Sequence, residues 1–292
     1  DGAMSRDSGG SGPRDRTGRD DRVPTVTVAD GGFAGLATDD RGVSNVVGYV
    51  LVFSLITVSV GVVSVAGLGS LQDARDAERI DNGERAFEVL ADNQRDIAQG
   101  GAPSRATEIK LAETTLTLAD PQDSTVTLSN GTVAGSTESR PITFRLSGDS
   151  GELSRGVVYE MGAVLRVDPG GAAMRRTPPF QFGSERTVIH YVTLESRTGA
   201  VQRESGSTTV LVRSVRGTTT LVSHYRPSNE VNITVQTTPR RAEAWHRYFT
   251  SELDGLSTGD PCQPLDGSGT VTCSFETDDL RVARTTIRAQ IS

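Results

Sequence analysis

The chain has 292 residues and a formal net charge of −7, from 37 acidic and 30 basic residues. This acidic balance argues against a nucleic-acid partner, because such partners select strongly basic surfaces. Lys110 is the only lysine. An acidic, lysine-poor composition suits a halophilic protein, since at 1 M salt the repulsion between surface charges is screened beyond about 3 Å. A GC-rich genome accounts for the arginine bias equally well.

The first segment, residues 1–38, is rich in Gly, Asp, Arg and Ser and has few apolar residues. It lacks the material for a hydrophobic core, so we expect it to be disordered. Because Asp1 is no initiator, either Met4 begins the natural chain or the first residues were added to it.

An apolar segment from Val43 to Gln72 carries no charged residue. About 20 helical residues cross a hydrocarbon core of roughly 30 Å, so the segment predicts a membrane-spanning helix. A buried core helix is the alternative, although soluble helices seldom run so far without a charge. A secretory signal peptide is disfavoured, because its apolar region is about 7 to 15 residues long and ends at a small-residue cleavage site.

The apolar segment continues into a stretch with helical periodicity. Ile80, Phe87, Leu90 and Ile97 fall on one face, and charged residues occupy the others, which predicts an amphipathic stalk. Glycine costs a helix about 1 kcal/mol relative to alanine, so a bend or loose turn at Gly83 is possible. We expect residues 43–100 to form one long helix that is transmembrane first and amphipathic afterwards.

Residues 104–292, here called the head, change to alternating apolar and polar residues with turn residues between the runs. This period-two pattern predicts antiparallel strands that form a sandwich or an open barrel. The expected fold class is therefore α+β, with a mainly antiparallel β head after the long helix. Eight runs carry the pattern, and the tail 269–292 repeats it: 107–120, 124–135, 141–148, 156–168, 187–196, 207–216, 218–226 and 230–238.

One short helix interrupts the strands in the C-terminal half of the chain. In residues 239–255 the apolar side chains of Ala242, Trp245, Phe249 and Leu253 fall on one side, and Gly255 ends the pattern. We interpret this aromatic face as core packing against the sheet.

Two cysteines, Cys262 and Cys273, flank a glycine-rich turn. A disulfide between them implies an oxidising, exported location, and two unpaired thiols in a cytosolic loop are the alternative. Their spacing does not fit a CxxC metal site. Asn130 and Asn232 begin N-glycosylation triplets, which agree with a head outside the cell.

Catalytic motifs are weak or missing. The sequence GDSGE at 148–152 resembles the nucleophile segment of trypsin-like proteases, which makes Ser150 a candidate. In that family a histidine and an aspartate precede the serine, whereas His190, His224 and His246 all follow it. A turn explains the motif. We found no nucleotide-binding or zinc motif, and we expect no enzyme, cofactor or metal site.

Arg41-Gly42 followed by VSNVVGYVLVFSLITVSVGVVSVAGLG resembles the class III signal sequence of archaeal type IV pilins and archaellins, particularly those of salt-loving archaea. The resemblance implies that a prepilin peptidase removes residues 1–42 and leaves Val43 as the mature N-terminus. It also implies that the helix packs against other pilin-like subunits. The residues expected at that packing surface are Val46, Val47, Leu51, Val58 and Val60.

Residues 83–111 are similar to haloarchaeal pilin-like proteins, and a long helix before a β head follows the pilin plan. Asn45 stands where the family usually has proline, and Val47 where bacterial pilins have an acidic residue. The head is also larger than that of a typical major pilin, so the expected role is that of a minor subunit.

Three functions remain open from the sequence. The first is a pilin-like subunit, anchored by one membrane helix with an extracellular head, that takes part in a surface filament or in adhesion. The second is a permanently anchored surface binding protein that does not polymerise. The third is a surface hydrolase built around Ser150. The arginines that flank the apolar segment do not decide the orientation in the membrane.

Overall fold

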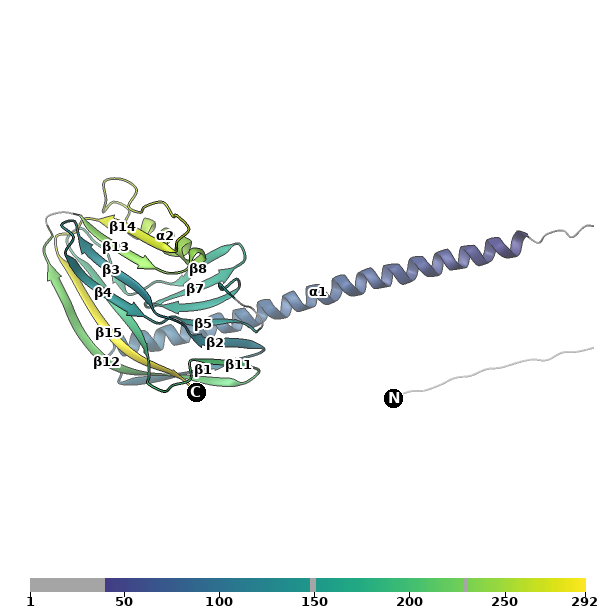
Figure 1. Cartoon of the computed structure of the whole chain (residues 1–292), viewed down its shortest axis with the longest axis horizontal. Coiled ribbons are helices and arrows are strands. Elements are labelled where there is room, and N and C mark those ends of the chain that lie inside the picture. The colour runs from purple at the N-terminus through teal and green to yellow at the C-terminus, as the bar shows by residue number, and fades with distance from the viewer. Residues whose placement is uncertain (1–39, 148–150, 228–229) are drawn as a thin grey trace, which may run out of the picture. The chain divides into compact units, whose positions relative to one another are not determined.

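The computed structural model describes residues 40–147, 151–227 and 230–292. Most of the predicted leader, residues 1–39, lies outside the described residues. Residues 62–292 form one compact unit, and the helical residues before it are described by themselves. A long N-terminal helix, mainly antiparallel sheets and one short helix confirm the expected α+β class (Figure 1).

The long helix, α1 (Asp40–Ala98), has 59 residues. The loose turn considered possible at Gly83 does not occur, because every position from Asp40 to Ala98 is α-helical. The helix ends as predicted at the glycine pair. Gly101 adopts the left-handed backbone conformation, with φ of +77°, which glycine accepts without steric cost.

Fifteen strands in the described part of the head form three sheets. The first sheet has the order β1 (Ser104–Lys110), β12 (Thr209–Tyr225), β15 (Leu280–Ile291), β10 (Thr187–Ser196), β9 (Phe180–Gln181). The second has the order β11 (Arg203–Gly206), β2 (Thr114–Leu118), β5 (Ile142–Leu146), β6 (Gly156–Glu160), β7 (Ala163–Asp168), β8 (Gly171–Arg176). The third has the order β14 (Thr270–Phe275), β13 (Val231–Gln236), β3 (Gln122–Leu128), β4 (Val133–Ser139).

The pairing and the length of some strands differ from the sequence-based prediction. Strand β10 pairs with β15 in parallel, although the pattern suggested antiparallel strands throughout. The expected runs at 207–216 and 218–226 form one strand, β12, of 17 residues. Its pairing with β15 is irregular between Arg216 and Thr219. The strand therefore passes through Gly217, which separates the two expected runs.

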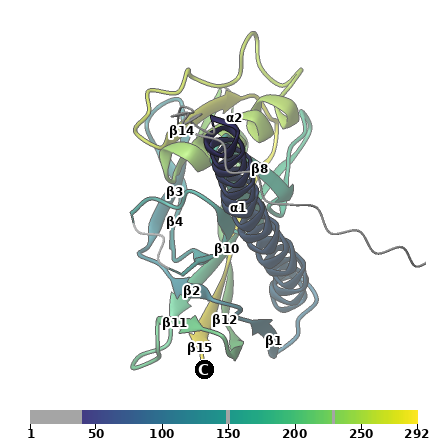
Figure 2. The ribbon, with the colours of Figure 1, turned by 90° about the vertical axis from the view of Figure 1, so that its right-hand side faces the viewer.

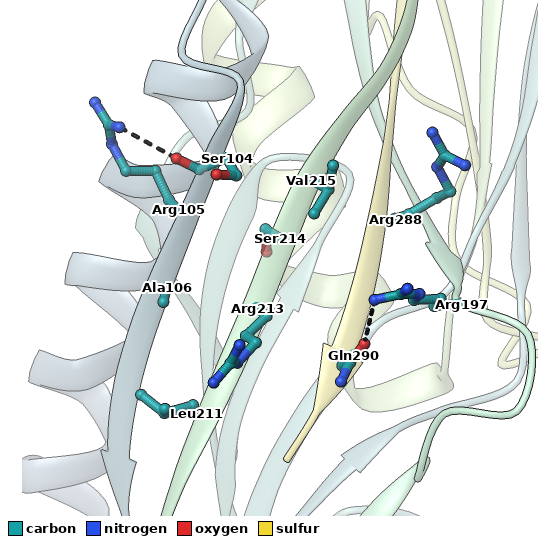
Figure 3. Close-up of a pocket in the computed structure, with 10 residues that line it drawn as sticks. All are labelled: Ser104, Arg105, Ala106, Arg197, Leu211, Arg213, Ser214, Val215, Arg288 and Gln290. Carbon is teal, nitrogen blue, oxygen red and sulfur yellow. Dashed lines mark hydrogen bonds between the residues drawn. The ribbon is translucent and has the colours of Figure 1, made fainter.

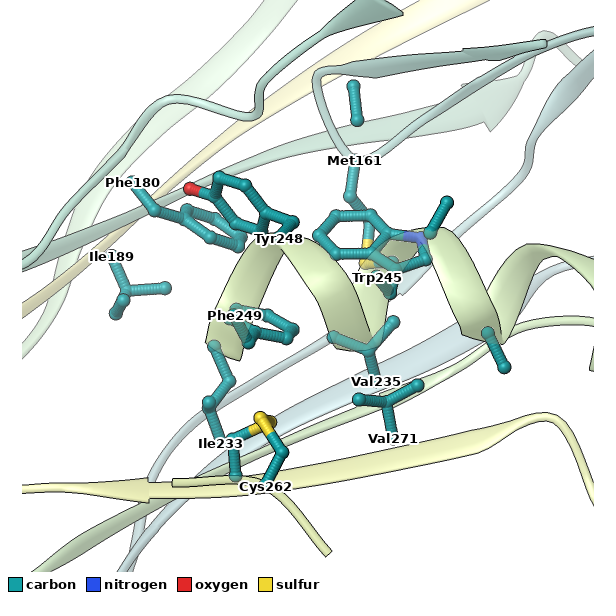
Figure 4. Packing of buried hydrophobic residues seen from close by; sticks show 14 of the residues in the cluster. Met161, Phe180, Ile189, Ile233, Val235, Trp245, Tyr248, Phe249, Cys262 and Val271 are labelled. Carbon is teal, nitrogen blue, oxygen red and sulfur yellow. A yellow bond between two sulfur atoms is a disulfide. The ribbon is translucent and has the colours of Figure 1, made fainter. Parts of the chain in front are cut away.

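The described residues of the head contribute to two hydrophobic cores. One lies around α2 (Pro239–Glu252), which packs on β7, β8 and β14 (Figure 4). Ala242, Trp245, Phe249 and Leu253 are buried there, which confirms that this face is core. The other core lies between α1 and strands of the first and second sheets.

Candidate functional site

The apolar segment is the largest exposed hydrophobic surface among the described residues. The side chains of Val46, Val47, Leu51, Val58 and Val60 are between 51% and 64% exposed. One helix of the described chain, Ser44–Ala98, is long and apolar enough to cross a membrane. Exposure of so large an apolar surface to water is unfavourable, so we expect it to be surrounded by lipid or by other apolar helices.

Three hydroxyl groups inside the apolar segment are satisfied by the helix itself. The hydroxyl groups of Thr57, Ser59 and Ser70 donate to the carbonyl oxygens four residues earlier, at 2.8, 2.7 and 3.1 Å. This local bonding satisfies these three donors. It lowers the cost of placing them in a hydrocarbon environment, where an unpaired polar group is costly.

Arg41, Gly42 and Val43, the residues of the predicted cleavage site, lie in the first turn of α1. The backbone is helical on both sides of the Gly42–Val43 bond. The uncharged helix therefore follows the predicted cut directly.

The C-terminal half of α1, residues 73–98, is part of the head's packing. Ile80, Phe87, Leu90 and Ile97, the four residues of the predicted stripe, have no exposed surface. The Phe87 ring meets the Phe144 ring of β5 edge to face, with centroids 6.1 Å apart. This half of the helix is therefore a structural element of the head and not a free stalk.

Ion pairs fix the polar sides of the same half. Arg166 on β7 contacts Asp81 at 2.5 Å and Glu84 at 2.9 Å. Hydrogen bonding to Asp81 is the main cause that raises the pKa of Arg166 above its ordinary value, so the group stays charged. Arg175 on β8 reaches Glu84 at 3.0 Å.

Further pairs join the helix to two sheet edges. Arg176 on β8 pairs with Asp92, and Arg105 on β1 pairs with Asp96. Strands β8 and β1 are the edge strands of the second and first sheets, and the C-terminal half of α1 lies between them (Figure 2). Four acidic residues of this half, Asp81, Glu84, Asp92 and Asp96, are thus partners of head arginines.

A buried charged cluster, absent from the sequence-based prediction, holds α2 to the strands. Glu160, at the end of β6, and Arg241 are 1% and 4% exposed and lie 2.6 Å apart. Trp245 donates its indole N–H to Glu160 at 2.5 Å, and Thr237 donates its hydroxyl at 3.0 Å. Gln122, in the amide orientation that satisfies both groups, donates to Glu160 at 3.0 Å. Because these groups are enclosed and mutually bonded, we assign the cluster a structural role.

Cys262 and Cys273 form the predicted disulfide. Both are buried, and Cys262 lies beside Ile233 in the core around α2 (Figure 4). The bridge joins the loop after α2 to β14 across a short stretch of chain. The bridge lowers the conformational entropy of the unfolded chain, and so stabilises the fold by about 3 kcal/mol or somewhat less.

The two glycosylation triplets lie in different settings. Asn130 is exposed in the turn between β3 and β4, where its Oδ1 accepts from the backbone N–H of Thr132 at 2.9 Å. Asn232 is half-buried in β13, and its Oδ1 accepts from the Ser274 hydroxyl at 2.7 Å. Asn130 is therefore the more accessible acceptor.

The histidines do not converge. His190 lies in β10 with Nε2 2.9 Å from the Thr285 hydroxyl, and burial lowers its pKa below the usual 6.5. His224 lies on β12, 3.3 Å from Asp279, and His246 lies on α2. Ser150 lies outside the described residues. Within those residues, no group of three His, Cys, Asp or Glu side chains is placed to hold a metal ion.

These features define a class of protein in which one apolar, membrane-compatible helix precedes an α+β head with a disulfide. The chain belongs to the family of unknown function DUF7289, whose match covers residues 41–290 and so includes both the helix and the head. No curated protein and no solved structure matches the chain.

Proposed function

We propose that this protein is a minor type IV pilin-like subunit of an archaeal cell surface. The observation that carries the proposal is the uncharged, exposed part of α1 that follows Arg41-Gly42 directly and continues to Gln72. A prepilin peptidase that cuts after Gly42 would remove the charged leader and keep this helix. The helix then anchors the subunit in the membrane, and it packs with other pilin-like helices in a filament.

Two further observations support the proposal. The family match begins at residue 41, next to the proposed cut, and leaves the preceding leader unmatched. The apolar segment contains Gly48, Gly61, Gly67 and Gly69, at which an added Cβ would meet nothing within 4 Å. Small residues let apolar helices approach closely, and close van der Waals packing drives helix association where lipid removes the hydrophobic drive.

The disulfide and Asn130 support an orientation with the head outside the cell. A bridge between Cys262 and Cys273 persists in an oxidising compartment, so we place the head outside the cell and the leader in the cytoplasm. In freshly isolated envelopes both thiols should resist alkylation until a reductant is added. Free reaction of both cysteines would contradict this topology.

Recovery in filaments tests the role. Surface filaments sheared from cells should contain the protein without residues 1–42. If the processed protein stays in the membrane under conditions in which other pilins are recovered in filaments, the filament role is refuted. The protein would then be a permanently anchored surface binding protein.

A further inference from the structure

Four arginines line a groove of about 790 Å³ on the first sheet (Figure 3), and one of them, Arg105, is already paired with Asp96. Of the other three, Arg213 comes from β12, Arg288 from β15 and Arg197 from the turn that follows β10. All three side chains are exposed. In a chain of net charge −7, this arginine groove gathers positive charge at one place.

The charge of the arginine groove is largely uncompensated. Arg213 and Arg288 form no hydrogen bond or ion pair with any residue that the structure describes. Arg197 donates to the neutral Gln290 at 3.0 Å. Glu195 lies opposite Arg288 in the register of β10 and β15 but makes no ion pair with it. Several guanidinium groups are therefore free to bind carboxylates.

A second groove, of about 580 Å³, has the opposite charge. Its lining includes the carboxylates of Glu230, Glu276 and Asp278. These three side chains are exposed, and none forms an ion pair with a described residue. The neighbouring Asp279 is already held by Arg281 at 3.0 Å, so it does not belong to this acidic groove.

The two grooves lie at opposite ends of β15. Asp278 precedes the first residue of the strand, Leu280, and Arg288 lies near its last, Ile291. Ten positions separate Asp278 from Arg288, which corresponds to about 33 Å at about 3.3 Å per residue. The carboxylates therefore cannot reach the arginines of their own chain.

We infer that the acidic groove of one copy docks into the arginine groove of a second copy. The two surfaces differ, so the contact is heterologous and leaves one unused groove at each end of a pair. Repetition of such a contact gives an open row of heads. The inference rests on the proposed function, because membrane helices that pack together bring the heads side by side.

Arginine suits this role for a geometric reason. Its planar guanidinium bonds a carboxylate through two parallel N–H groups, which fixes orientation as well as charge. Each exposed pair contributes little by itself, so the contact needs several pairs and the close approach of the two grooves. Direct pairs of this kind persist at high salt better than long-range attraction does.

Introduced cysteines test the contact in the full chain. Both natural cysteines are in the disulfide, so Arg213→Cys with Asp278→Cys adds the only free thiols among the described residues. Mild oxidation in envelopes should give a reducible ladder of this protein, and either single variant alone should give none. Arg213→Cys with Asp266→Cys is the control, because Asp266 is exposed in a turn outside both grooves. Absence of the ladder, or cross-links to a different protein instead, would overturn the inference.

Charge reversal gives the second arm. Arg213→Glu with Arg288→Glu should reduce yields at least tenfold in chemical cross-linking between copies, and co-expression with Glu276→Arg, Asp278→Arg chains should restore the mixed pair. If the charge-reversal variants are processed and form filaments as the wild type does, the contact between the grooves is refuted and the proposed function still holds. Cross-linked heads in a protein that never enters filaments would support the contact and refute the filament role.

Discussion

Gly83 of α1 lies so close to the Phe144 ring that a Cβ on residue 83 would come within 3.0 Å of the ring carbon Cζ and nearer still to the ring edge. The glycine therefore permits the contact between the helix and β5. Phe87, one turn further on, meets the same ring from the side. The C-terminal half of α1 is fitted to the head at this point.

Gly83→Ala should destabilise the head, because the new methyl group overlaps the buried Phe144 ring. Overpacking costs about 1 to 3 kcal/mol, which exceeds the gain of up to about 1 kcal/mol in helix propensity. Denaturant unfolding of the detergent-solubilised chain, followed by the fluorescence of the single tryptophan, Trp245, measures the difference. Gly69→Ala, at a helical position with open space around it, is the control and should leave the midpoint unchanged or raise it slightly. Greater stability of Gly83→Ala would contradict this role of the glycine.

Glu160→Gln should lower the free energy of unfolding by about 3 to 5 kcal/mol, because it leaves the buried Arg241 without its counter-charge. The change should also alter Trp245 fluorescence in the folded state, since the indole N–H donates to Glu160. Glu243→Gln on the exposed side of α2 is the matched control and should have little effect. A Glu160→Gln variant as stable as the wild type would show that the cluster does not hold α2.

His190 should make the stability of the head depend on pH. Burial lowers its pKa below 6.5 in the folded chain, so folding favours the neutral ring. This contribution is complete above about pH 6.5 and is lost as the pH falls from there toward the folded pKa. Unfolding curves between pH 7.5 and 5.5 should show the decrease, and His190→Gln should remove it while His246→Gln keeps it. An unchanged pH dependence in His190→Gln would contradict the assignment.

The main helices and their order along the chain could be predicted from local sequence patterns. The absence of charge from Val43 to Gln72 and the stripe from Ile80 to Ile97 predict α1, and the aromatic face predicts α2. These signals are strong because each repeats over several turns. The short strands β8, β9 and β11 were missed because they contain few residues and little alternation.

Contacts between distant segments could not be predicted in this way. Nothing in the local sequence shows that Glu160 meets Arg241, or that the acidic residues of α1 face arginines on β7 and β8. From the sequence, Gly83 showed only an unfavourable helix propensity, because the residue it packs against, Phe144, lies 61 positions further along the chain. The parallel pairing of β10 with β15 likewise depends on the connections between strands and not on the strands themselves.

Val58→Asp should separate anchoring from assembly. A central aspartate costs about 2.5 to 3.5 kcal/mol in a membrane helix, which so long an apolar run tolerates for insertion. The same charge disturbs close packing between helices. The variant should stay in membranes and be missing from sheared filaments, whereas Val58→Leu should be present in both. Equal recovery of the two variants in filaments would refute a packing role for this face.

The N-terminal residue of the mature protein tests the central claim most directly. The protein should be extracted from envelopes of cells with active prepilin peptidase and sequenced from its N-terminus. The account predicts that the sequence begins at Val43, and that a Gly42 variant with a bulky side chain keeps its leader. A wild-type protein that retains residues before Val43 in such cells would contradict processing as a pilin.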